Sequence, residues 1–182
     1  MLDLLKYKTP EKYSSDFKEA YSYINVRQIK ILSTAIFLLA AILRIFAVIF
    51  YDRMSGIPSF HEYHVSNLVQ LSLGPVFIVL STIAARSRSW TVTQRNLLTL
   101  LFAMFLLSIC FYISYVYSQH NAKNTMTMFL IGIVVVSIFF SLEFKYILIL
   151  SFYTVFLFVI GMIVPSLNTD QKIMNTGAAV IL

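Results

Sequence analysis

The apolar run from Ile31 to Tyr51 constrains this chain more than any other stretch of its sequence. At about 1.5 Å per residue, a helix of this length spans roughly 30 Å, which is the thickness of the hydrocarbon core of a bilayer. Arg44 is the one charged residue within the run. We therefore expect a membrane-spanning helix that carries a single ionisable group at intramembrane depth.

The composition extends this expectation to all 182 residues. Hydrophobic residues make up 59% and charged residues 12% of the chain, whereas soluble proteins average about 45–50% and about 25%. A chain of this length has too little interior to hide that much apolar surface from water. Its apolar runs are continuous and do not alternate, which disfavours a β-barrel. The sequence predicts an all-α, polytopic bundle of transmembrane helices.

Short polar segments divide the chain into six apolar runs, of which the sixth is only half as long as a bilayer crossing requires. We expect five complete spans and a truncated sixth, over about residues 31–51, 66–85, 97–117, 125–142, 146–164 and 173–182. A chain end within hydrocarbon would leave carbonyl groups unpaired. We therefore expect these residues to be a fragment of a longer protein.

Basic residues gather on one side of the predicted spans, as the positive-inside rule requires of the cytoplasmic side. The segments before the first span, between the second and third, and between the fourth and fifth hold Lys6, Lys8, Lys12, Lys18, Arg27, Lys30, Arg86, Arg88, Arg95 and Lys145. The other side holds Arg53, Lys123 and Lys172. We expect a cytoplasmic N-terminus. The net charge of +6 belongs to these flanks, so we expect no nucleic-acid partner.

Residues 1–30 are the one sizeable polar segment, a cytoplasmic lead-in to the predicted sensor bundle of residues 31–182. Thr9, Pro10 and Glu11 have the features of a helix start. An apolar stripe follows at helical spacing, at Tyr13, Phe17, Tyr21 and Ile24. Two interpretations stay open. The lead-in is an amphipathic helix on the anionic leaflet, or it extends the first span and packs against a neighbour.

Arg44 lies in the outer third of the first span, about 10 Å from its outer end. One interpretation is a structural arginine whose guanidinium snorkels to the interface. The other is an anchor for an anionic or carbonyl-bearing ligand in an outward-facing pocket. In that case Asn67 and Gln70 of the second span are its expected neighbours.

His61, Glu62 and His64 precede the second span on its outer side. Two His and one Glu, even with His120, are a weak basis for a metal site, which needs three or four placed ligands and a second shell. We predict no metal site here. A pH-sensitive pair and solvated loop residues stay open, and we count all three residues among the candidate ligand-binding residues.

Gly74 and Pro75 interrupt the second span near its middle. Pro75 has no amide hydrogen, so the carbonyl of Leu71 loses its helical partner, and we expect a kink there. The sequence holds no P-loop, HExxH or GxSxG motif and no paired catalytic carboxylates, so we predict no catalytic residue and no cofactor within it. The spans also lack acidic residues, which counts against active transport.

Several stretches resemble a known family. They are residues 16–21 (DFKEAY), residues 25–31 (NVRQIKI) before the first span, the turn at residues 139–145 (FFSLEFK), and Asn175. With them, the chain from about Asp16 onward resembles the six-helix membrane sensor modules at the N-termini of bacterial histidine kinases, diguanylate cyclases and adenylate cyclases. The resemblance implies a homodimeric input domain in the bacterial cytoplasmic membrane. It also implies a C-terminal output enzyme, either a histidine kinase or a nucleotide cyclase.

The expected function is therefore a sensory input domain that relays an extracytoplasmic or intramembrane signal to that output enzyme. Two alternatives of other classes stay open. The chain is a fragment of a small transporter or permease, which interrupted spans allow, or a passive membrane anchor that localises and dimerises its output domain. The sequence does not name the signal.

Overall fold

The computed structural model describes residues 11–57, 59–120 and 126–163, together with positions 170, 172, 173 and 176. All the regular secondary structure in these residues is helical. The helices are α1 (Glu11–Ile49), α2 (Tyr51–Met54), α3 (Phe60–Arg86), α4 (Val92–His120), α5 (Thr127–Phe139) and α6 (Phe144–Ile163). Thr9, Pro10 and most of the predicted sixth run lie outside the described residues.

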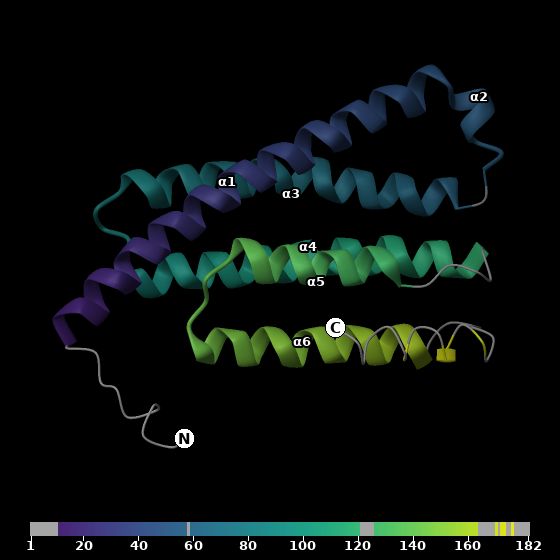
Figure 1. The fold of residues 1–182 in the computed structure, drawn as a ribbon. Helices are drawn as coiled ribbons and strands as arrows, with labels where there is room; N and C mark the ends of the chain where they lie inside the picture. The colour runs from purple at the N-terminus through teal and green to yellow at the C-terminus, as the bar shows by residue number, and fades with distance from the viewer. Residues whose placement is uncertain are drawn as a thin grey trace.

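The helices run up and down and form a bundle with two distinct ends, in which α1 crosses α3 diagonally (Figure 1). The start of α1 and the connections at residues 87–91 and 140–143 meet at one end, which we call the basic end. The short helix α2 marks the opposite end, which we call the α2 end. Because each connection between consecutive long helices is short, neighbours in sequence run antiparallel.

Four helices are long and apolar enough to cross a membrane: Ser15–Ile49 within α1, Phe60–Arg86, Val92–Ser118 within α4, and Phe144–Ile163. A shorter apolar helix, α5, has 13 residues and is therefore only about 20 Å long. Large apolar side chains cover the outside of the bundle, and Ile138, Phe144 and Phe152 are 74–76% exposed. Such a surface is unfavourable in water, so the structure fits a helical membrane protein.

Helix α1 continues without a break through residue 30, where the sequence suggests a division between lead-in and span. One face of its first half packs into the bundle, with Asn25 and Val26 fully buried, while Phe17 is 59% and Ile24 is 50% exposed. Phe17 and Ile24 of the predicted apolar stripe therefore face outward. Both interpretations of the lead-in stay predictions.

Small side chains let α1 and α3 approach closely, as is usual where helices pack in lipid. A Cβ added at Gly74 of α3 would lie 3.1 Å from the Cβ of Phe37 on α1. Ala40 of α1 is fully buried, and its carbonyl accepts a hydrogen bond from the side chain of Asn67, 2.9 Å away. This seam fixes the depth at which polar residues of the two helices meet.

Helix α4 supplies more of the core than any other helix, because its apolar residues lie on nearly every face and it is packed between the other helices. Phe102 is fully buried and its ring contacts those of Phe77 and Phe140, with centroids 5.0 and 5.9 Å away. Gly132 brings α5 against α4, since an added Cβ would lie 2.9 Å from the Cβ of Cys110.

The fourth apolar helix ends earlier than predicted. We expected a span over residues 125–142, whereas α5 ends at Phe139 and Phe140 already has an extended backbone. The reason is a tertiary contact: Asn25 of α1 donates to the carbonyl of Ser141 at 2.8 Å and accepts from its amide at 3.1 Å. These bonds satisfy the backbone N–H and C=O groups of Ser141, which have no helical partner once the backbone is extended.

Candidate ligand pocket at the α2 end

A pocket of about 340 Å³ opens between α1 and α3 at the α2 end, with α4 forming its third wall. Its volume is within the range of small-molecule sites. Most of the lining is apolar or aromatic, and polar groups come from both α1 and α3. The lining residues are Leu43, Arg44, Ala47, Met54, Ile57, Phe60, Tyr63, His64, Ser66, Asn67, Gln70, Ile113 and Tyr117.

Arg44 and His64 meet inside this pocket, although 20 residues separate them in sequence. The Nη1 atom of Arg44 lies 2.7 Å from Nδ1 of His64 and also contacts Nε2. A guanidinium has only N–H donors, so the imidazole nitrogen that faces it is the acceptor and carries no proton. His64 is therefore neutral in this arrangement, and the cationic side chain of Arg44 donates a hydrogen bond to a neutral partner.

Asn67 and Gln70 lie one and two helical turns farther along α3. The amide nitrogen of Asn67 is committed to the carbonyl of Ala40, but its Oδ1 atom is buried without a hydrogen-bond partner in the described part of the chain. A buried acceptor without a partner costs free energy. The Nε2 atom of Gln70 donates to the hydroxyl of Ser66 at 3.2 Å.

His61 and Glu62 do not line this pocket. Together with His64 and Ser59 they border a neighbouring shallow depression at the start of α3. Ser59 has a left-handed backbone, with φ of 67°, and its hydroxyl is buried without a partner among the described residues. Within the described ranges, no three His, Cys, Asp or Glu side chains gather closely enough to hold a metal ion.

The third wall of the pocket comes from α4, which the sequence did not associate with this site. Ile113 and Tyr117 line it, and the ring of Tyr117 contacts that of Tyr63 with the centroids 5.3 Å apart. The sequence analysis did not single out Tyr117 as a candidate residue. Which face of α4 meets α3 depends on tertiary packing, so no local signal identified these residues.

Gly74 and Pro75 lie within α3, which stays helical from Phe60 to Arg86. Gly74 is buried against Phe37, so its lack of a side chain has a direct packing use. Both residues lie about one helical turn beyond Gln70 along α3, farther from the α2 end. They are outside the pocket lining, and a role in conformational change stays a prediction.

A second arginine, Arg95 of α4, contrasts with Arg44. It is 2% exposed and lies at the basic end, where its Nε donates to the carbonyl of Ala84 at 3.2 Å and its Nη2 to the hydroxyl of Tyr23 at 2.8 Å. Its guanidinium carbon also lies 3.8 Å from the centre of the Tyr23 ring. The sequence counted Arg95 only as a cytoplasmic charge.

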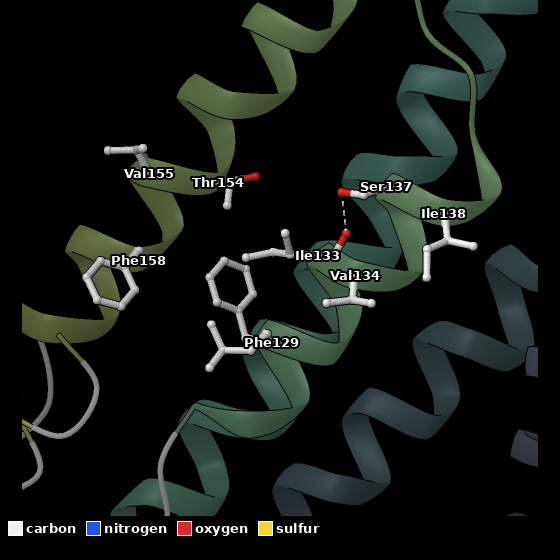
Figure 2. Close-up of a pocket in the computed structure, with 9 residues that line it drawn as sticks. Phe129, Ile133, Val134, Ser137, Ile138, Thr154, Val155 and Phe158 are labelled. Carbon is white, nitrogen blue, oxygen red and sulfur yellow. Dashed lines mark hydrogen bonds between the residues drawn. The ribbon is translucent and has the colours of Figure 1, made fainter. Parts of the chain in front are cut away.

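A second groove, of about 400 Å³, lies between α5 and α6. Figure 2 shows its wall of apolar side chains, among them Phe129, Ile133 and Phe158. Its two hydroxyl groups are already satisfied, since Ser137 donates to the carbonyl of Ile133 and Thr154 to that of Leu150, at 2.9 and 2.8 Å. The two hydroxyl oxygens can still accept hydrogen bonds, but no charged residue lines this groove, so the α2-end pocket is the stronger candidate.

Comparison of this chain with protein-family models, with curated proteins and with solved structures gives no match.

Proposed function

We propose that this chain is a membrane-embedded sensory input module whose ligand site is the α2-end pocket. One observation carries the proposal: Arg44, His64, Asn67 and Gln70, which the sequence singles out as candidate ligand-binding residues, line one pocket of ligand size. A passive anchor has no need for such an arrangement, because a cation within the membrane is costly and marks a functional site by default.

In the proposed orientation the basic end is cytoplasmic and the α2 end faces outward across a bacterial cytoplasmic membrane. The distribution of Lys and Arg supports this orientation. The helix α5 and its flanking residues would make the fourth of five crossings. The output is a histidine kinase or a nucleotide cyclase that acts as a homodimer, as the resemblance to six-helix sensor modules implies.

The helix α1 offers a physical connection between pocket and basic end. It carries Arg44 in the pocket wall, and it carries Tyr23 and Asn25, which contact Arg95 and Ser141 at the opposite end. A ligand that shifts α1 against α3 would alter both contacts. Such a shift requires a differential affinity of only a few kcal/mol between two packings, and the Gly74–Pro75 site is our candidate hinge.

The test joins residues 1–182 to a diguanylate cyclase reporter and measures product formation in cells across a panel of small acids, alcohols and amines. We expect at least one compound to change the output. Arg44→Leu should abolish that response, whereas Arg53→Leu, which removes an exposed cation outside the pocket at the same end, should preserve it.

A control replaces the module with an unrelated helical bundle. Output that is the same with the unrelated bundle, under every compound, would identify a passive anchor. Uptake of a compound by vesicles that contain the chain alone would instead favour the transporter alternative.

A further inference from the structure

The chemistry of the α2-end pocket also indicates the class of ligand. We infer that the pocket binds a compact amphiphilic monocarboxylate, with its carboxylate on Arg44 and its apolar body against the side chains around it. This inference rests on the proposed function, because it names the signal that the module would receive.

The charge of the pocket is the first argument. Arg44 carries the one formal charge among the described residues that line it, and no Asp or Glu is among them. A cation that is partly withdrawn from water, as Arg44 is, is stabilised by a counter-charge or by several acceptors. The neutral imidazole of His64 provides an acceptor and no negative charge, so a single negative charge would complete the site.

The shape of the guanidinium is the second argument. Its planar fork of N–H groups matches the two oxygens of a carboxylate, which it binds with two parallel hydrogen bonds. A dianionic phosphate would require more positive charge than one arginine supplies. The imidazole of His64 accepts from Nη1, and that contact holds the guanidinium within the pocket until a ligand replaces it.

The apolar lining is the third argument. Met54, Ile57 and Phe60 surround the side of the pocket nearest α2, and Leu43 and Ile113 line it from α1 and α4. These surfaces favour an aromatic or aliphatic body over a sugar or an amino acid, whose polar groups would lose hydrogen bonds to water. The volume of about 340 Å³ is at the small end of the range for ligand sites and is too small to enclose a whole two-chain lipid.

The buried Oδ1 atom of Asn67 adds a possible point of selectivity. It has no partner among the described residues, so a hydroxyl or amide N–H on the ligand body would satisfy it. Acids that carry such a donor should bind more tightly than the plain acid, because an unpaired buried acceptor is costly.

The test uses the whole chain in phosphatidylcholine nanodiscs and isothermal titration with 4-phenylbutyrate and with 4-phenylbutan-1-ol, which share one apolar body. Empty nanodiscs give the partitioning background. We expect the acid to bind roughly 10- to 100-fold more tightly than the alcohol, since hydrogen bonds to a charged group contribute about 1.5–3 kcal/mol. Arg44→Leu should remove this difference and Arg53→Leu should retain it.

Elution profile and unfolding temperature check that both variants fold, and Arg44→Gln replaces Arg44→Leu if the latter does not. Equal affinities for acid and alcohol, or equal behaviour of the Arg44 and Arg53 variants, would overturn the inference. So would loss of acid binding in nanodiscs that contain phosphatidylglycerol, because the anion on Arg44 would then be a lipid phosphate.

The two proposals fail in different ways. If the acid does not bind but the reporter responds to another compound through Arg44, the carboxylate inference fails and the sensory function stands. If the acid binds through Arg44 but the reporter output never changes, the inference stands and the sensory function fails.

Discussion

Arg44 and Arg95 are both held within apolar helices, yet the bundle uses them in opposite ways. Arg95 is buried at the basic end, where two backbone carbonyls, a tyrosine hydroxyl and an aromatic ring take up its donors and its charge. Arg44 is partly buried in a pocket at the α2 end and rests on the neutral ring of His64. The number of satisfied donors therefore separates an arginine that builds the fold from one that is available to a ligand.

The largest effect should come from Arg95→Leu. The substitution removes a buried guanidinium and leaves the carbonyl groups of Ala84 and Ser87 and the hydroxyl of Tyr23 without their donor. We expect a loss of about 3 kcal/mol in the free energy of unfolding, measured by reversible denaturation in mixed micelles. A loss below that of an exposed substitution such as Arg88→Leu would remove the contrast between the two arginines.

Asn25 of α1 and Asn67 of α3 test the same contrast between the two ends of the bundle, with a smaller expected effect. Asn25 makes two hydrogen bonds with the backbone of Ser141 at the basic end, whereas Asn67 makes one with Ala40 near the pocket. We expect Asn25→Leu to cost about 2 kcal/mol and Asn67→Leu about half as much. The same denaturation assay measures both, and the reverse order would contradict the assignment of the basic end as the tightly built one.

The close contact between α1 and α3 at Gly74 can be tested by adding a side chain there. In Gly74→Ala the new Cβ would lie 3.1 Å from that of Phe37, so α1 must shift by a few tenths of an ångström. We expect a loss of about 1 kcal/mol from overpacking, together with weaker binding of 4-phenylbutyrate. Gly56→Ala is the matched control, because no atom lies within 4 Å of a Cβ added there, and it should leave both quantities unchanged.

A substitution at Ser59, which has a left-handed backbone, should raise the free energy of unfolding, whereas the substitutions above lower it. Residues other than glycine pay about 1–2 kcal/mol in this conformation, and a glycine at position 59 would remove this cost. Part of the resulting gain in stability is lost again because glycine is more flexible in the unfolded chain. We expect Ser59→Gly to stabilise the chain by about 0.5–1 kcal/mol. Ser59→Ala keeps the Cβ and should give no such gain, and a stabilisation in both variants would show that the unpartnered hydroxyl is the costly group.

The sequence predicted the helices of this bundle well, because runs of about 20 apolar residues have few alternatives in lipid. It also placed Arg44 and Asn67 at similar depths, since antiparallel spans joined by a short loop pair their outer ends. It missed the role of Arg95 and the early end of α5. Both depend on Tyr23, Asn25 and Ser141, which are distant in sequence and meet only when α1 packs across the basic end.

It likewise missed the α4 wall of the pocket. Helix α4 is apolar on nearly all faces, so its periodicity does not show which side meets α3. The candidate residues His61 and Glu62 are close to His64 in sequence, yet they border the neighbouring depression, which shares His64 with the pocket. The spacing of residues along one helix does not show which of them share a pocket until the position of the neighbouring helix is known.

The smallest expected effect on stability is that of Arg44→Leu, and it closes the comparison with Arg95. The substitution removes one hydrogen bond to His64, and side-chain hydrogen bonds within membranes average about 0.6 kcal/mol. It also removes the cost of holding a cation at intramembrane depth, so we expect the free energy of unfolding to change by less than about 0.6 kcal/mol in either direction. The same denaturation assay used for Arg95→Leu measures it. A loss near 3 kcal/mol would make Arg44 a structural arginine like Arg95, and the pocket would lose its anchor.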